Sequence, residues 1–180
     1  NVLFIADEIQ SGLGRTGATV QCQNEKVTPD MYILGKALGG GIVPVSAVVG
    51  TADVMGVLKP GQHGSTFGGN PLSCAAGIAA LKALTEDGLV KNSERMGNIF
   101  REGLEKLKEK HSIIREIRGK GLMIGLEFDK EVGELRKKLI YDEHIFTGGS
   151  MNKKLLRILP PLNVSIAELE PFVKALKKSL

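Results

Sequence analysis

The sequence has 180 residues, of which 42% are hydrophobic, 24% charged and only 4% aromatic, and this length suits one ordinary domain or two small ones. The charges are mixed (24 Lys and Arg against 20 Asp and Glu) and the net charge is +4, which argues against intrinsic disorder and against a nucleic-acid-binding surface. No apolar run reaches the roughly 18 residues of a membrane span, and two cysteines without a CxxC pair exclude a disulfide scaffold and favour a reducing, cytoplasmic compartment.

Residues 2–6 form an apolar run that ends at Asp7 and Glu8, and the chain has no initiator methionine before it. Such a short apolar run is typical of a fully buried strand, whose partners must come from elsewhere in the protein. We therefore expect an N-terminal portion to precede Asn1.

Two more strands are predicted in the first half, over residues 31–34 and 45–49. Thr51 is expected to cap a short helix that runs to Leu58. A longer helix should follow, with Asn70 as its N-cap and Pro71 at its first position. This order of elements predicts part of an α/β layer. The small residues of the longer helix predict close packing on a neighbour: Cys74, Ala75, Ala76, Gly77, Ala79 and Ala80.

The second half has the pattern of an α+β appendix, which begins near residues 85–90. Apolar residues from Met96 to Leu107 recur at spacings of 3, 1, 3, 1 and 3, which indicates an amphipathic helix. Ser165 and Glu168 form a capping box for a final helix. The elements between these helices are expected to be strands over 113–117 and 122–128, a charged helix over 130–141 and a strand over 155–159.

Asp7 stands at the end of the first predicted strand, where open α/β sheets bind ligands. A buried Asp at this place should be paired with a cation or a strong donor. The alternative is a structural Asp that caps the following loop, and this feature alone does not decide between them.

Lys36 follows the second predicted strand and Gly35. Burial of an amine in an apolar, glycine-rich setting favours its neutral form, which is a nucleophile and later a proton carrier. The residues Gly39 to Gly41 leave room for a bulky group beside it. For a lone lysine, the favoured alternative is a side chain that reaches the surface from the end of a strand.

The glycine-rich loop 64–71 places Ser65 and Thr66 just before a helix N-terminus, which suits an anion such as a phosphate. Taken by itself, this loop is more simply interpreted as a glycine-rich turn without a ligand. The three histidines are far apart in the sequence, so no metal site is expected. Together, an acid, a reactive amine and a phosphate cradle indicate pyridoxal phosphate, which has a pyridine nitrogen, an aldehyde and a phosphate.

Five blocks of the sequence, in the right order, resemble the class III (ornithine/acetylornithine-type) aminotransferases, which are fold-type I pyridoxal-phosphate enzymes. The blocks are Phe4 to Gly17, Pro29-Asp30 with Leu34 to Gly41, His63 to Leu72, Arg118 to Leu122, and Leu156 to Leu162. The resemblance implies an α/β fold in two parts. Residues 1–86 would be the distal part of the cofactor-binding large domain, and residues 87–180 the small C-terminal α+β domain.

The resemblance also implies roles for single residues. Lys36 is similar to the Schiff-base lysine, and Asp7 to the carboxylate that keeps the pyridine nitrogen protonated. Gln10 resembles the residue that contacts the ring oxygen of the cofactor. Ser65 and Thr66 resemble the phosphate-binding pair, which in this family reaches the active site of a neighbouring subunit, so a homodimer or higher oligomer is expected.

Arg157 resembles the arginine that binds a substrate carboxylate, for which a bidentate guanidinium is suited. The implied reaction is transamination, with 2-oxoglutarate as the amino acceptor. Within the family, the blocks around Lys36 and from Lys59 to Gly64 are most similar to members that act on the terminal amine of ornithine and give a semialdehyde. Members that act on acetylornithine are the alternative.

Chains of this family are about twice as long as this one. In relatives, the part that precedes Asn1 supplies a second phosphate loop and the aromatic residue that stacks on the cofactor. We therefore expect the isolated chain to bind the cofactor weakly and not to turn over. The competing interpretation is a non-catalytic module that only packs against a partner.

Overall fold

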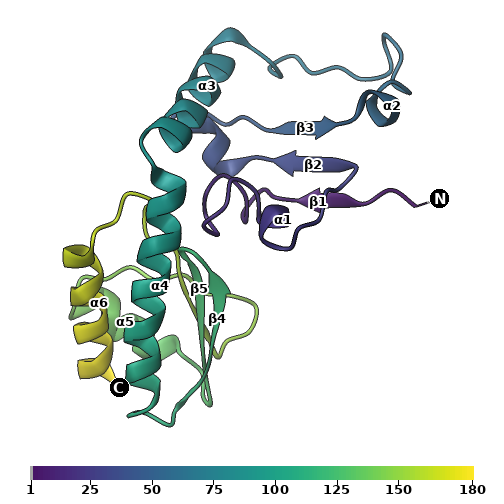
Figure 1. Ribbon diagram of the computed structural model, residues 1–180. Coiled ribbons are helices and arrows are strands. Elements are labelled where there is room, and N and C mark those ends of the chain that lie inside the picture. The colour runs from purple at the N-terminus through teal and green to yellow at the C-terminus, as the bar shows by residue number, and fades with distance from the viewer. Residues whose placement is uncertain (1) are drawn as a thin grey trace. The chain divides into compact units, whose positions relative to one another are not determined.

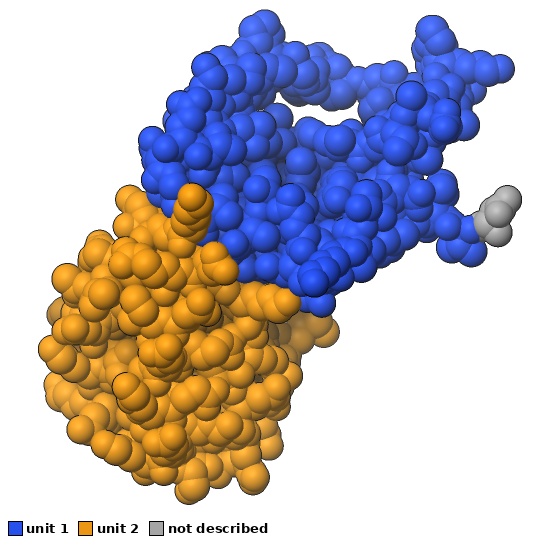
Figure 2. Space-filling view, viewed as in Figure 1, with its two compact units in different colours: residues 1–90 blue, residues 91–180 orange. Residues whose placement is uncertain are grey.

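The computed structural model describes residues 2–180 of the protein. The chain divides into two compact units, unit 1 (residues 1–90) and unit 2 (residues 91–180), which are blue and orange in Figure 2. Each unit is described by itself below.

The sheet of unit 1 has three strands in the order β1-β2-β3, namely β1 (Ile5–Asp7), β2 (Met31–Leu34) and β3 (Ala47–Gly50) (Figure 1). β1 and β2 are parallel, and β3 returns antiparallel with Ala47 opposite Leu34. Parallel strands end at the same edge of a sheet. The ends of β1 and β2 and the start of β3 therefore lie along one edge.

β1 is more exposed than its apolar sequence predicted. Val2, Leu3, Phe4 and Ile5 are all exposed, and only Ala6 in this run is buried. β1 stands at one end of the strand order, and β2 is its one strand partner in the described chain. Within residues 2–180 the strand is therefore not buried, and its burial by partners from elsewhere in the protein stays a prediction.

Besides its strands, the described part of unit 1 has four helical segments: α1 (Gln21–Asn24), the 3-10 turn η1 (Lys36–Gly39), α2 (Ala52–Met55) and α3 (Pro71–Glu86). The sequence did not predict α1 and η1, because four residues are too few to show a helical period. The start of α3 is as predicted. Pro71 is its first residue, and the side chain of Asn70 accepts a hydrogen bond from Ser73 N–H at 3.0 Å.

The small residues of α3 pack on one side only, although the sequence predicted close packing for the whole set. Gly77 is buried and packs close to η1. A Cβ at this position would lie 3.5 Å from the carbonyl oxygen of Leu38. Ala80 lies on the same side, with its Cβ 3.5 Å from the position of a Cβ on Gly40. Other small residues of the helix are exposed: Cys74, Ala75 and Ala79.

Unit 2 contains the predicted helices and strands in the predicted order (Figure 1). They are α4 (Leu89–Lys108), which begins in the last two residues of unit 1, and β4 (Ile114–Lys120), β5 (Met123–Phe128), α5 (Gly133–Tyr141), β6 (Leu155–Ile158) and α6 (Ile166–Ser179). The sheet order is β4-β5-β6, and both pairings are antiparallel. Within residues 2–180, none of the helices has the length and apolar character needed to cross a membrane.

One face of the unit 2 sheet and the inner sides of its helices form its core. Alternate residues of β5, from Ile124 to Phe128, are buried, as expected for a strand with one covered face. Met96, Phe100 and Leu104 form a buried stripe along α4, which confirms the predicted amphipathic helix. The ring of Phe100 meets that of Phe172 on α6 edge-on, with 5.3 Å between the centroids.

Candidate active site

The C-terminal ends of β1 and β2 bring two of the predicted residues to one edge of the unit 1 sheet. Asp7 is the last residue of β1, and Lys36 is the second residue after β2, which ends at Leu34. Because the two strands are parallel, these ends lie at the same edge. Open α/β sheets bind ligands at the carboxyl ends of their strands, so this edge is the candidate site of unit 1.

Asp7 is exposed, and the buried carboxylate at this edge belongs to Glu8, of which 2% is accessible. Successive strand residues point to opposite faces, and here Ala6 and Glu8 take the covered face. The Oδ1 of Asp7 accepts a hydrogen bond from Ile9 N–H at 3.0 Å, which is a loop-capping contact. The prediction of a buried Asp7 is therefore wrong, because a uniformly apolar run does not show which face is covered.

Glu8 anchors the loop that follows β1. Its Oε2 accepts a hydrogen bond from the hydroxyl of Ser11 at 2.7 Å, and its Oε1 accepts one from Cys22 N–H at 2.8 Å. Burial by itself raises the pKa of Glu8, but hydrogen bonds from Ser11 and from the backbone of Gln21 and Cys22 bring this pKa below its ordinary value. Glu8 is thus an ionised support for the loop that carries the half-buried Gln10.

Lys36 opens η1 with a left-handed backbone, at a φ of 46°. Residues with a side chain rarely adopt this conformation, which costs of order 1–3 kcal/mol, and Lys36 shares it with Leu13, Lys26 and His144 among the described residues. The Lys36 side chain is exposed. The prediction of an amine buried in an apolar setting is therefore wrong for this chain, and the alternative, a side chain that reaches the surface from the end of a strand, is what the structure shows.

A pocket of about 400 Å³ lies beside Lys36. Its walls are the segment Pro44–Ser46 before β3, the loop residues Phe67–Gly69, and Ser73 in the first turn of α3. This volume is within the range of small-molecule sites. The structure therefore brings the lysine together with part of the glycine-rich loop that precedes α3.

The glycine-rich loop is exposed and is folded by its own side chains. The Oγ of Ser65 accepts a hydrogen bond from Gly68 N–H at 2.9 Å, and Asn70 caps α3. Gly69 has a φ of 67°, which favours glycine. In the described chain, the other predicted cofactor residues of unit 1 lie outside the pocket wall: Asp7, Gln10, Ser65 and Thr66.

Arg157 lies on β6 in unit 2, half-buried between the buried residues Leu156 and Ile158. Its backbone exchanges two hydrogen bonds with Gly148, from Gly148 N–H at 2.8 Å and to Gly148 O at 3.0 Å. The guanidinium Nε is buried and has no hydrogen-bond partner within residues 2–180. A buried donor without a partner is unusual, and the planar fork of Arg157 suits a carboxylate ligand.

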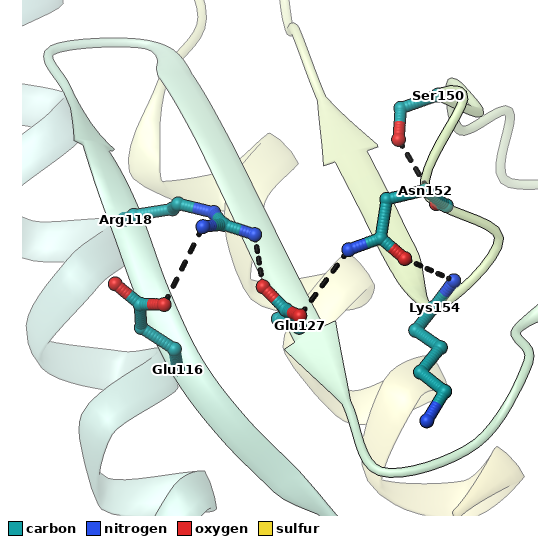
Figure 3. Close-up of polar contacts among 6 residues, drawn as sticks. All are labelled: Glu116, Arg118, Glu127, Ser150, Asn152 and Lys154. Atoms are coloured by element: carbon teal, nitrogen blue, oxygen red, sulfur yellow. Dashed lines mark hydrogen bonds and ion pairs between the residues drawn. The ribbon is translucent and has the colours of Figure 1, made fainter.

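A second arginine of unit 2, Arg118, is already paired (Figure 3). It lies on β4 and forms ion pairs with Glu116 and with Glu127 of β5. The other oxygen of Glu127 accepts a hydrogen bond from Asn152 at 3.2 Å, which ties the segment before β6 to this face of the sheet. The guanidinium of Arg118 is thus already paired with carboxylates of the same chain, in contrast to that of Arg157.

Sequence reasoning missed two polar residues at the unit 1 site. Glu8 could have been found from strand alternation, because Ala6 and Glu8 share a face. Ser46, in the pocket wall, carried no local signal, since only the return of β3 to the sheet edge places it there. Within residues 2–180, no three His, Cys, Asp or Glu side chains gather as a metal site would require.

Comparisons with known proteins agree with each other. The family model "Aminotransferase class-III" matches residues 1–180. The ornithine aminotransferase of Geobacillus sp. (strain WCH70) is 48% identical over 179 residues, which are 99% of this chain and 44% of that protein. The chain therefore spans less than half the length of this curated relative.

Two solved structures give the same result for the fold. The ornithine aminotransferase of Toxoplasma gondii, described with PLP at partial occupancy in its active site, matches with a TM-score of 0.93 and 43% identity over 99% of this chain and 43% of its own. The acetylornithine aminotransferase of Elizabethkingia anophelis matches with a TM-score of 0.91 and 43% identity, over 99% of this chain and 48% of its own.

Proposed function

The chain belongs to the class-III aminotransferase family, and on this premise we propose that the full polypeptide in which residues 1–180 occur moves the terminal amino group of ornithine to 2-oxoglutarate. The products would be glutamate semialdehyde and glutamate. The similarity to ornithine aminotransferases supports ornithine as the donor. The observation that carries the proposal is the position of Lys36, in a pocket at the carboxyl edge of the unit 1 sheet.

The residues at this edge fit pyridoxal phosphate. The pocket of about 400 Å³ is large enough for a small cofactor, and it has an amine and hydroxyls in its walls. A carboxylate, that of Asp7, stands at the same edge. When bound, pyridoxal phosphate supplies an aldehyde for an amine and a ring that accepts electrons from the reacting carbon.

Each of the predicted residues has a proposed task toward this cofactor. The Nζ of Lys36 would hold it covalently and, once released, would carry the proton between substrate and cofactor carbons as base and then acid. The carboxylate of Asp7 would hold a proton on the ring nitrogen, and Gln10 would contact the ring oxygen. The hydroxyls of Ser65 and Thr66 would bind a phosphate.

Arg157 would bind a substrate carboxylate. Its buried, unpartnered Nε within the described chain supports this task, because a carboxylate can accept from Nε and a terminal nitrogen together. Arg118 is a poorer candidate, since Glu116 and Glu127 already occupy it.

We propose the domain roles that the resemblance implied. Residues 1–86 would be the distal part of the cofactor-binding domain and residues 87–180 a small C-terminal domain. The unit division near residue 90 and the separate core of unit 2 support this assignment. The exposure of Ser65 and Thr66 supports their reaching a neighbouring subunit, so we propose a homodimer or higher oligomer.

Acetylornithine is the second candidate donor. Its support is the acetylornithine aminotransferase among the solved structures, which is as similar in sequence as the ornithine enzyme. Measuring kcat/KM for the two donors on the same preparation decides between them, and the proposal requires the higher value for ornithine.

The covalent role of Lys36 is tested by mass spectrometry. The full polypeptide is incubated with pyridoxal phosphate, reduced with borohydride and digested, and the pyridoxyl group is expected on Lys36. Lys26→Met is the matched control, because Lys26 is another exposed lysine of unit 1 with a left-handed backbone (φ 55°). Lys36→Met should lose both the label and amino transfer, whereas Lys26→Met should keep both. Amino transfer by Lys36→Met at the wild-type rate would overturn the proposal.

The same labelling on residues 1–180 alone tests the non-catalytic interpretation. We propose that this chain by itself takes up little label and does not turn over, since only Lys36 of the predicted cofactor residues in unit 1 lines the pocket. Stoichiometric label and turnover in the isolated chain would contradict this.

A further inference from the structure

Buried side-chain atoms without a hydrogen-bond partner gather at the segment Thr147–Gly149 of unit 2. Three buried side-chain atoms have no hydrogen-bond partner within residues 2–180, and all belong to this segment or to the two arginines beside it. They are the Nε of Arg136, the Oγ1 of Thr147 and the Nε of Arg157. Buried polar groups are nearly always paired, so such a concentration marks a place with a task beyond folding.

The two glycines of the segment each make room for a different arginine. A Cβ on Gly148 would lie 2.9 Å from the Nε of Arg157, and a Cβ on Gly149 would lie 2.9 Å from the Nη1 of Arg136. Both distances are shorter than real Cβ atoms show. The backbone of the segment is therefore in direct contact with both guanidinium groups.

Arg136 holds the segment from α5. Its Nη2 donates a hydrogen bond to the carbonyl oxygen of Thr147 at 3.1 Å. The next residue, Gly148, exchanges two backbone hydrogen bonds with Arg157. One continuous chain of contacts thus runs from Arg136, through Thr147 and Gly148, to Arg157.

We propose that Arg136 is a positioning residue for Arg157. By fixing Thr147–Gly149, it keeps Gly148 paired with β6 and so holds the guanidinium of Arg157 in place for a carboxylate. The carboxylate-binding task of Arg157 rests on the proposed function, whereas the mechanical link rests only on the contacts above. A charge on α5 would ordinarily be solvated, but Arg136 is half-buried and directed at this backbone.

The test uses three variants of the full polypeptide. Arg136→Met removes the donors but keeps the apolar stem, and Arg136→Lys keeps a donor and the charge. Lys137→Met is the matched control, because this neighbour on α5 is exposed and pairs with Glu134 on the same helix. Each variant is examined by amide hydrogen exchange, resolved to residues 147–157, and by steady-state kinetics with 2-oxoglutarate.

In Arg136→Met, the amides of Gly148 and Arg157 should exchange about tenfold faster, because the segment opens locally more often. KM for 2-oxoglutarate should rise by about tenfold with kcat within about twofold, the sign of a lost interaction that stabilises the bound substrate and the transition state equally. Arg136→Lys should lie between Arg136→Met and the wild type, and Lys137→Met should match the wild type.

Unchanged exchange at Gly148 and Arg157 in Arg136→Met would overturn the proposal. A raised KM with unchanged exchange would also overturn it, in favour of direct contact between Arg136 and the ligand. If the wild-type polypeptide transfers no amino group, the proposed function fails, but the exchange measurement still decides the positioning role.

Discussion

Gly148 and Arg157 exchange both of their backbone hydrogen bonds, at 2.8 and 3.0 Å, although they are nine positions apart in the sequence and Gly148 lies outside the named strands. The pair forms an isolated antiparallel β-bridge beside β6. Because Gly148 has no side chain, the guanidinium of Arg157 can lie close to the backbone of Gly148.

Replacing Gly148 by alanine should therefore weaken carboxylate binding. The new Cβ would lie 2.9 Å from the Nε of Arg157 and 3.3 Å from its carbonyl oxygen, so the guanidinium must move. A displaced charge-assisted hydrogen bond is worth about 1.5–3 kcal/mol, which is a rise of roughly ten- to a hundredfold in KM for 2-oxoglutarate. Gly133→Ala is the control, since a Cβ there meets no other atom within 4 Å. Equal KM values in the two variants would contradict the interpretation.

Gly97 on α4 should not tolerate a side chain. A Cβ there would lie 2.2 Å from the carbonyl oxygen of Gly121, in the turn between β4 and β5, and neither backbone can yield easily. We expect Gly97→Ala to lower the free energy of unfolding by about 3 kcal/mol, as overpacking in a close contact does. Urea denaturation followed by far-UV circular dichroism measures this.

Gly103 on the same helix is the matched comparison for Gly97. A Cβ there would lie 3.9 Å from Val173, an ordinary contact. Gly103→Ala should therefore raise the free energy of unfolding by about 0.5–1 kcal/mol, because alanine is the better helix former. Equal destabilisation by both substitutions would show that the close approach of Gly97 to Gly121 is not the cause.

Glu8 should make the stability of unit 1 sensitive to acid. Burial raises the pKa of Glu8, but its hydrogen bonds outweigh burial and place the pKa below the ordinary value of 4.5. A lowered pKa in the folded state means that the carboxylate stabilises the fold above that ordinary value, and that this contribution is lost as the pH falls through the folded-state pKa. Glu8→Gln should flatten this acid-side dependence. It should also lower the free energy of unfolding by about 1–3 kcal/mol at neutral pH, because the donors of Ser11 and Cys22 would then face a neutral amide in place of an ionised carboxylate.

The control for Glu8 is Glu86→Gln, at the exposed end of α3. Unfolding is followed by urea denaturation at several pH values between neutral and acid. If Glu86→Gln flattens the dependence of the free energy of unfolding on pH as much as Glu8→Gln does, the effect comes from net charge and not from the contacts of Glu8.

The two cysteines should differ in reactivity. Burial, and then the hydrogen bond to the Glu8 carboxylate, raise the pKa of the Cys22 thiol, and the thiolate is the reactive form. Cys74 is exposed on α3. Iodoacetamide at mildly alkaline pH should therefore label Cys74 first, as peptide mass spectrometry will show. Faster labelling of Cys22 would mean that its contact with Glu8 does not persist in solution.

The sequence predicted those parts of the fold whose signals are local. The Asn70–Pro71 start of α3 was placed correctly, because a cap needs only neighbouring residues. The Ser165–Glu168 box was also correct: the Glu168 carboxylate accepts from Ser165 N–H at 2.8 Å. The stripe from Met96 to Leu104 was correct because its period is helical.

The parts that depend on distant contacts were not predicted. The apolar run before Asp7 gave no sign of which face would be covered, and so the exposed Asp7 was expected to be buried instead of Glu8. Arg136 stands in a charged helical segment, where an arginine ordinarily faces solvent, and its contacts with Thr147 and Gly149 are visible only in the fold. Lys36 was first proposed from its place after a strand and beside glycines, whereas Arg157 was proposed only from the family motif around it, and both roles stay predictions.

The exposed β1 has a consequence for handling this chain in solution. Residues 2–6 are apolar, contain no charge and no proline, and lead into an edge strand whose outer backbone groups can pair with another molecule. Such a segment is a template for intermolecular strand pairing. In a preparation of the 180-residue chain, colloidal stability will therefore depend on what covers β1, and a lysine or proline placed in this run would act as a gatekeeper against aggregation.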